Sequence, residues 1–277
     1  MGSSREEIAA SFDLRAPGYR ESDWHRRSAR RLVDLCLLKP GDRVLDLGTG
    51  TGFAALHAAE QVGDRGHVLG VDISEGMLRE ARRDAADAGL ANVVFARQDA
   101  TSLPDLADGS FDVVTCATSL LYIPIVEGLG EARRVLRTGG VMALSTIRRG
   151  FPLAGRLFRE RAAGFGVAIS DPCEPLGSED ACRRALSAAG FDDVDVVIET
   201  IDFSPRDLAR AWESNLHAPS HHDVRRLPAD ALGALEREYR EALAAQAQAD
   251  PSALLRSEML YALARRSHSA GVRKGER

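Results

Sequence analysis

Short apolar runs alternate with amphipathic segments between residues 43 and 147. This alternation is typical of a parallel sheet with helices packed on both of its faces. The apolar runs predict five strands, at Arg43–Leu47, His67–Asp72, Val93–Arg97, Phe111–Cys116 and Gly140–Ile147. Helices are expected to begin near Phe53, Glu75 and Ile125. Because crossovers between parallel strands are right-handed, we expect a doubly wound, Rossmann-like sheet.

Beyond residue 150, the alternation of apolar runs with amphipathic segments is less regular. Ser178 can cap a helix that Gly190 ends, and both Val194–Thr200 and Glu258–Arg265 alternate like strands. The block between these two strands is polar and alanine-rich, with helical periodicity from residue 204 onwards. We therefore expect a helical lid that is inserted between the last two strands and covers one edge of the sheet.

The expected fold class is α/β, with a seven-stranded sheet, helices on both faces, an N-terminal helical segment and the inserted lid. These parts divide the chain into five segments. They are a helical cap segment (1–42), a Rossmann-like core (43–203), the lid (204–252), the final strand of the core (253–266) and a polar, basic tail that we expect to fray (267–277).

Composition narrows the possible partners. The chain has 277 residues, is 44% hydrophobic and carries a formal net charge of -5, so no broad basic surface for nucleic acid is expected. No apolar run approaches the roughly 20 residues of a membrane helix, and the first residues do not resemble a signal peptide. We therefore expect a cytoplasmic protein, monomeric or homodimeric, that acts on a small molecule and binds neither nucleic acid nor membrane.

A glycine-rich turn separates the first strand from the helix that follows it, in VLDLGTGTGFAALHAA (Val44–Ala59). The free backbone N–H groups of that helix favour an anion or an electron-rich group, and Gly48, Gly50 and Gly52 let it approach the backbone. A dinucleotide fold would place its third glycine at position 53, where this chain has Phe53, and a phosphate-binding loop would need a lysine that is absent here. The turn therefore disfavours a nicotinamide-dependent oxidoreductase.

Two aspartates follow the next two strands. Asp72 ends the second strand, roughly 20 residues after the loop, where a carboxylate can accept both hydroxyls of a ribose. Asp99 follows the third strand, where it can accept a hydrogen bond from an exocyclic amine. Either aspartate alone is more often a cap or a solvated turn residue, but the two strand ends and the glycine loop converge on one crevice.

These motifs resemble those of the class I S-adenosylmethionine-dependent methyltransferases. The likeness is to the group that is similar to the ubiquinone and menaquinone C-methyltransferases and to bacterial natural-product methyltransferases. It covers about residues 10 to 147, and five elements occur in the family's order. They are LDLGTGTG (Leu45–Gly52), GVDIS (Gly70–Ser74) with Met77 beyond it, QDATSLP (Gln98–Pro104), FDVVTCATSLLYI (Phe111–Ile123) and EARRVLRTGGVMALS (Glu131–Ser145).

The resemblance implies S-adenosyl-L-methionine as cofactor and S-adenosyl-L-homocysteine as product, with no metal. The implied cofactor-binding residues fall into four groups. They are the glycines beside the methionine part with their supporting acid (Gly48, Gly50, Gly52, Asp46), the ribose-binding Asp72, the residues at the adenine and ribose (Ile73, Met77, Asp99, Ala100), and Ala117, which runs past the cofactor. For Met77, packing in the helix core is an equally good interpretation.

Candidates for the acceptor side come from the segments that cover the crevice. Tyr19 lies where many relatives have a tyrosine that closes the cofactor site, and Tyr122 lies where relatives often have histidine. In the lid, Trp212 and His217 suggest a substrate wall. We take Tyr19 and His217 as the catalytic candidates, with His217 as the base. A metal site at 221–223 is disfavoured, because close spacing alone does not give convergent geometry.

The acceptor class is less defined than the cofactor. Residues 116–119 do not carry the motif of nucleic-acid N-methyltransferases, which disfavours DNA and RNA as acceptors. A protein acceptor stays open as an alternative. Because the inserted lid favours a small-molecule pocket, a specialised metabolite methylated at oxygen, carbon or nitrogen is the expected acceptor. The alternative is a non-methylating protein on the same fold, either a cofactor-binding protein or a cyclase-like enzyme, because fold does not determine function.

Overall fold

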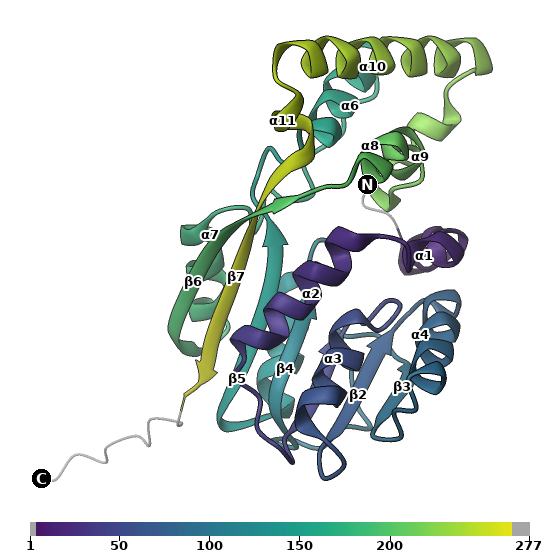
Figure 1. Cartoon of the computed structure of the whole chain (residues 1–277). Coiled ribbons are helices and arrows are strands. Elements are labelled where there is room, and N and C mark those ends of the chain that lie inside the picture. The colour runs from purple at the N-terminus through teal and green to yellow at the C-terminus, as the bar shows by residue number, and fades with distance from the viewer. Residues whose placement is uncertain (1–3, 268–277) are drawn as a thin grey trace, which may run out of the picture.

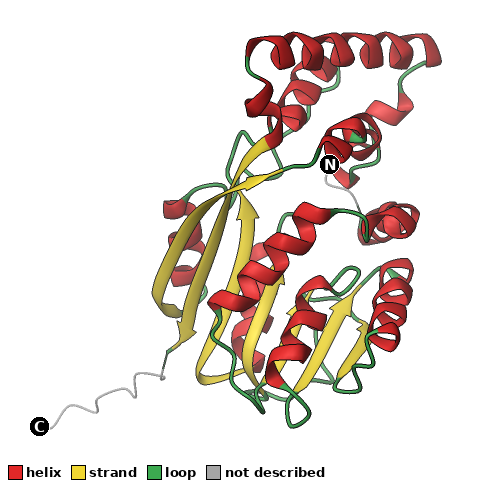
Figure 2. Ribbon diagram, viewed as in Figure 1, coloured by secondary structure: helices red, strands yellow, loops and turns green. Residues whose placement is uncertain are grey.

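The computed structural model describes residues 4–267, and it confirms the α/β class with a single seven-stranded sheet (Figures 1 and 2). The strands lie in the order β3-β2-β1-β4-β5-β7-β6. Their bounds are β1 Arg43–Leu47, β2 His67–Asp72, β3 Val93–Arg97, β4 Phe111–Ala117, β5 Leu136–Ile147, β6 Phe191–Asp202 and β7 Arg256–Arg266. Strands β1 to β5 are parallel, whereas β7 runs antiparallel to both β5 and β6.

Helices cover both faces of the sheet, and each face has its own hydrophobic core. On one face α2 (Asp23–Leu35), α3 (Phe53–Val62) and α4 (Glu75–Asp87) pack on the strands through residues such as Leu32, Ala58 and Leu78. On the other face α5 (Ile125–Val135) and α7 (Glu179–Ala188) bury Leu129 and Leu186. Helix α1 (Arg5–Tyr19) lies beyond the carboxyl ends of the parallel strands β2 and β3 (Figure 1).

The expected starts of three helices are confirmed, at α3, α4 and α5, and the Ser178 cap of α7 accepts a hydrogen bond from the Ala181 N–H at 3.2 Å. Three strands begin earlier than predicted, and for β7 the difference is only from Glu258 to Arg256. Strand β5 begins at Leu136, which is fully buried and pairs with Phe111, so the strand continues through a glycine pair that the sequence indicated as its boundary. Strand β6 begins at Phe191 and contains an irregular register between 192 and 195, which hides its period from the sequence.

The lid combines segments from two parts of the chain. Helices α8 (Pro205–Ala209), α9 (Ala211–Leu216), α10 (Ala229–Ala249) and α11 (Pro251–Leu255), with two short 3-10 turns, lie between β6 and β7. They share a third core with α6 (Leu153–Gly164), whose Phe158 packs beside Trp212 and Tyr239. The predicted lid began at residue 204, but α6 precedes it and packs with it. Residues 253–255, predicted as part of the final strand, belong to α11.

Within residues 4–267, no helix is both long enough and apolar enough to cross a membrane.

Candidate active site

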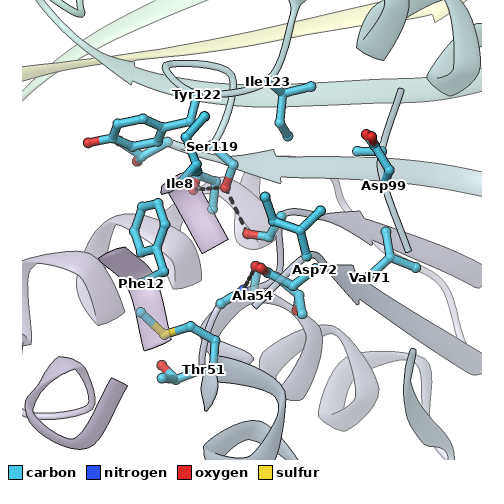
Figure 3. Close-up of a pocket in the computed structure, with 18 of the residues that line it drawn as sticks. Ile8, Phe12, Thr51, Ala54, Val71, Asp72, Asp99, Ser119, Tyr122 and Ile123 are labelled. Atoms are coloured by element: carbon cyan, nitrogen blue, oxygen red, sulfur yellow. Dashed lines mark hydrogen bonds between the residues drawn. The ribbon is translucent and has the colours of Figure 1, made fainter. Parts of the chain in front are cut away.

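A cavity lies at the carboxyl ends of β1, β2, β3 and β4, and we call it the cofactor cavity (Figure 3). Its floor comes from the glycine loop and from the residues that follow β2, β3 and β4, and α1 covers it. Figure 3 shows Phe12 and Tyr122 together at one side and Asp99 at the other, with Asp72 between them. Of the predicted cofactor residues, eight line the cavity: Gly48, Gly50, Asp72, Ile73, Met77, Asp99, Ala100 and Ala117.

The glycine loop adopts a backbone that favours glycine. Gly48 and Gly50 have φ of 61° and 55°, in the left-handed region. A Cβ on Gly48 would lie 2.5 Å from the Ser119 Cβ, and Ser119 donates a hydrogen bond to the Gly48 carbonyl at 2.7 Å. Gly52 is the N-cap of α3 and faces the core instead, where a Cβ would lie 3.1 Å from the Phe95 ring. The loop is therefore held by the segment after β4 on one side and by the core on the other.

Asp72 joins the loop to the start of α4. Its Oδ2 accepts a hydrogen bond from the Gly50 N–H at 2.8 Å, and its Oδ1 accepts one from the Ser74 N–H at 2.9 Å. Burial raises the pKa of Asp72, and the two backbone hydrogen bonds oppose this effect. The carboxylate thus lies ready at the end of β2 to accept hydrogen bonds from a ligand.

Asp46 lies behind the loop and is 1% exposed, so it does not line the cavity. Its Oδ1 accepts a hydrogen bond from the Thr115 hydroxyl at 2.7 Å. Burial raises the pKa of Asp46 to about 6, against hydrogen bonds from Thr49, Thr115 and the backbone of Ala55. The side chain therefore links β1 to β4 beneath the loop.

Helix α1 is tied to both sides of the cofactor cavity. Arg5 forms an ion pair with Asp99 at 2.6 Å, and its guanidinium also donates to the Thr101 hydroxyl at 2.9 Å. Asp13 Oδ1 accepts hydrogen bonds from the Ser74 hydroxyl at 2.6 Å and from the Gly76 N–H at 2.7 Å. The helix is thus held across the opening by polar contacts to the segments that follow β2 and β3.

A second, larger cavity of about 550 Å³ lies between α1, α2 and the lid, and we call it the acceptor cavity. The predicted residues Tyr19, Tyr122 and His217 line it. Five residues line both cavities and therefore form the junction between them: Phe12, Tyr19, His25, Thr118 and Tyr122. The Phe12 and Tyr122 rings meet edge to face, with centroids 5.2 Å apart.

The titratable side chains of the junction favour their neutral forms. Burial raises the pKa of Tyr19 and of Tyr122, and in both cases the nearby Arg15 charge opposes the effect. Burial also lowers the pKa of His25 well below its usual value, and Arg15 adds to this shift. The His25 ring packs on Tyr19 and on Trp24, with centroids 4.6 Å and 3.5 Å apart. His25 is therefore a neutral imidazole near pH 7.

The lid residues differ in position from one another. The His217 imidazole is 43% exposed, with Nε2 3.4 Å from Glu213 Oε2, and it lines the acceptor cavity alone. Trp212 is 5% exposed and packs on Phe158 and Tyr239 in the core of the lid, outside the lining of both cavities. The predicted substrate contact of Trp212 thus has no support from its position, because its indole fills the lid core instead.

His221, in the segment where a metal site is disfavoured, is 3% exposed, and its ring stacks on Phe158 with centroids 5.2 Å apart. Burial lowers its pKa to about 4. Within the described part of the chain, no group of three or more His, Cys, Asp or Glu side chains is arranged to hold a metal ion.

Sequence reasoning did not identify three charged or titratable residues of the site, Arg5, Arg15 and His25. A signal was present in the spacing of α1, where Ile8, Phe12 and Tyr19 recur on one face with Arg15 and line the two cavities. Only the folded chain shows that this face covers a cavity rather than a packed core.

The cofactor cavity fits an adenosyl group in its chemistry. Asp72 offers carboxylate oxygens, and Met77 and Ala100 give an apolar surface. Two cavity-lining polar atoms, Gln98 Oε1 and Thr51 Oγ1, are buried and meet no hydrogen-bond partner within residues 4–267. A ligand that carries amine and hydroxyl donors would satisfy such atoms.

Comparisons with known proteins agree with this site. A family model described as a methyltransferase domain matches residues 38–173. The aklanonic acid methyltransferase DauC of Streptomyces sp. (strain C5) is 35% identical over 52% of this chain and 66% of its own length. The nocamycin O-methyltransferase of Saccharothrix syringae is 34% identical over 65% and 70%. The ubiquinone/menaquinone biosynthesis C-methyltransferase UbiE of Ectopseudomonas mendocina is 36% identical over 57% and 62%.

Solved structures share the fold. The YcgJ protein of Bacillus subtilis superposes with a TM-score of 0.56 and 18% identity, over 87% of this chain and 99% of that one. The cyclase SpnF gives a TM-score of 0.52 and 25% identity, over 87% and 82%. Together with the sequence relatives, they show that this chain belongs to the class I S-adenosyl-L-methionine-dependent methyltransferases, in the group that includes UbiE and natural-product O-methyltransferases, and that S-adenosyl-L-methionine is its cofactor.

Proposed function

We propose that the protein transfers a methyl group from S-adenosyl-L-methionine to an oxygen, carbon or nitrogen atom of a small molecule in the acceptor cavity. The observation that carries this proposal is the junction, because its five residues line both cavities. Methyl transfer depends mainly on placing the nucleophile in line with the bond that breaks, and the junction is the place where two bound ligands would meet.

The cofactor residues of the proposal are those that the resemblance implies. The sulfonium of the cofactor supplies an activated methyl group. Asp72 would bind the ribose hydroxyls, Gly48 and Gly50 would border the methionine part, and Met77 would pack against the adenine or the ribose. For Asp99 to face the adenine, its ion pair with Arg5 would have to share the carboxylate with the ligand or open.

Removal of a proton is needed if the acceptor is a hydroxyl or an acidic carbon. His217 remains the proposed base, since it lines the acceptor cavity and lies beside Glu213. Because burial raises the pKa of Tyr19, its phenol stays protonated near neutral pH. We therefore propose that Tyr19 donates a hydrogen bond to the acceptor at the junction and does not act as a base.

A role in specialised metabolism is the finer part of the proposal. The names of two relatives describe methylation of aklanonic acid and of nocamycin. The acceptor cavity is consistent with a molecule of some size, since its volume is about 550 Å³ and aromatic and aliphatic side chains form much of its wall.

The test is incubation of the purified protein with S-adenosyl-L-methionine and a panel of small molecules, followed by mass spectrometry. Formation of S-adenosyl-L-homocysteine with a matching methylated product is the expected result. The similarity to the cyclase SpnF supports a second candidate function, a cyclase-like rearrangement without methyl transfer. In that case the acceptor would rearrange without a change in mass, and S-adenosyl-L-homocysteine would not form.

A further inference from the structure

Arg15 places a positive charge beside the junction. It lies on the face of α1 that also carries Phe12 and Tyr19, and it lines the acceptor cavity. Its guanidinium carbon is 5.2 Å from the centre of the Phe12 ring and 5.6 Å from that of the Tyr19 ring. Both rings line the two cavities, so this charge lies next to the place where cofactor and acceptor would meet.

The guanidinium has no counter-charge within residues 4–267. Its Nη1 is shielded from solvent and meets no hydrogen-bond acceptor. Its polar partner is the hydroxyl of Tyr122, which lies within hydrogen-bonding reach of the guanidinium, and burial keeps that phenol neutral by raising its pKa. An arginine does not lose its proton in proteins, so the charge remains. Arg15 as a whole is half-buried, but a charged atom that is shielded from water, as Nη1 is, normally has a partner, because loss of hydration without one is unfavourable.

The other charged side chains of the acceptor cavity are already engaged. Arg159 pairs with Asp171 at 3.0 Å, and Arg210 contacts Glu21 at 3.4 Å. The remaining two charges are carboxylates, which are engaged as well. Glu213 lies beside His217, and Asp207 accepts from the backbone and hydroxyl of Ser204 at the start of α8. Arg15 is therefore the unmatched charge among the residues that line this cavity.

We infer that Arg15 binds an anionic group of the acceptor, and that the acceptor is a small apolar molecule with a carboxylate. The inference rests on the proposed function, which assigns the larger cavity to the acceptor. A carboxylate matches a guanidinium in charge and in the geometry of its two oxygens. The apolar part of the molecule would contact the aromatic side chains of the cavity wall, which include Trp24, Phe151 and Phe203.

Arg15 could instead serve only to anchor α1 by stacking on Phe12 and Tyr19. The two roles differ in what removal of the charge does to the empty protein. A purely structural Arg15 stabilises the fold, so Arg15→Met would lower the melting temperature. A guanidinium that waits for a ligand without a counter-charge gives an empty protein whose melting temperature Arg15→Met leaves unchanged or raises.

The experiment is calorimetric titration of the protein, saturated with S-adenosyl-L-homocysteine, with benzoate, naphthoate and anthroate and with the carboxamide of each. We expect at least one acid to bind, and to bind about tenfold or more tightly than its amide, as a charge-assisted hydrogen bond implies. In Arg15→Met this preference should disappear, whereas Arg15→Lys should retain part of it. Arg210→Met is the matched control, because Arg210 lines the same cavity but is already paired, and it should keep the preference.

Three results would overturn the inference: no acid binds better than its amide, Arg15→Met keeps the preference, or Arg15→Met lowers the melting temperature by several degrees. Binding of S-adenosyl-L-homocysteine to every variant separates this failure from failure of the proposed function. Arg15 does not line the cofactor cavity, so cofactor affinity should be unchanged in Arg15→Met. If the wild-type protein does not bind S-adenosyl-L-homocysteine, the proposed function itself fails.

Discussion

Asp72→Ala tests the cofactor site most directly. The substitution removes the carboxylate that now holds the Gly50 and Ser74 N–H groups at 2.8 Å and 2.9 Å, and it leaves the end of β2 without an acceptor for a ribose. A hydrogen bond to a charged group contributes about 1.5 to 3 kcal/mol. The loss of two hydrogen bonds to the ribose should therefore cost about 3 to 6 kcal/mol of binding free energy, which weakens the affinity by about a hundredfold or more.

Asp72→Asn adds a pH test of the same carboxylate. Burial raises the pKa of Asp72 in the free protein, and ribose hydroxyls that donate to the ionised form would lower it again in the complex. The affinity of the wild-type protein should therefore fall as the pH drops through the raised pKa, because protonation of Asp72 then competes with binding. The Asn variant should bind weakly and show no such slope.

The assay is calorimetric titration with S-adenosyl-L-homocysteine, with circular dichroism and a melting curve to establish that each variant is folded. Asp64→Ala is the matched control, because Asp64 is exposed and lines neither cavity. A folded Asp72→Ala variant with wild-type affinity would refute the assignment of Asp72 to the cofactor.

Three further predictions concern the parts of the protein around this carboxylate. The pKa of Asp46 is about 6 in the folded protein and about 3.9 in the unfolded chain, so ionisation of Asp46 destabilises the fold as the pH rises through 6. Between pH 5 and 7 the wild type should therefore lose about 1 kcal/mol of unfolding free energy relative to Asp46→Asn, measured by urea unfolding. An equal difference between the two proteins at both pH values would contradict this. Asp13→Ala removes the hydrogen-bond acceptor that ties α1 to Ser74 and Gly76. Limited proteolysis should then cut the chain before α2 faster, and S-adenosyl-L-homocysteine should bind more weakly. An unchanged cleavage rate would show that other contacts hold α1. Phe158→Ala opens a cavity at the fully buried centre of the lid core and should lower the free energy of unfolding by about 3 to 5 kcal/mol, measured by thermal or urea unfolding. Cofactor affinity should persist, because Phe158 does not line the cofactor cavity. A large loss of affinity would mean that the lid supports that site.

Most of the fold could be predicted because local pattern and tertiary structure agree over residues 43–147. Strands β1, β2 and β3 have the predicted bounds, since each is a short apolar run that a turn ends. The errors lie where packing overrides local preference. Strand β5 continues through an irregular stretch at Gly139 and Gly140, because pairing with β4 holds it on both sides, at Leu136 and again at Val141. A sequence window gives no information about a neighbouring strand.

Some residues of the candidate site could be predicted from local sequence, and others could not. The glycine loop, Asp72 and Asp99 were found because their chemistry is coded within a few residues of strand ends. Arg5 acts through a contact far away in the chain, its ion pair with Asp99. Arg15 and His25 reach the acceptor cavity only because α1 and α2 fold beside it, and a local sequence window does not show that placement. Trp212 illustrates the opposite error, because an aromatic residue in a lid can face its own core as easily as a ligand.

The antiparallel pairing of β6 with β7 bears on how the acceptor range can evolve. Asp202 pairs with Arg256, so most of the lid leaves the sheet and returns to it at neighbouring positions. Such an insertion can be lengthened, shortened or exchanged without moving the strands that carry Asp72 and the glycine loop. A change in the segment between β6 and β7 would therefore reshape the acceptor cavity while the strand ends of the cofactor cavity stay in place.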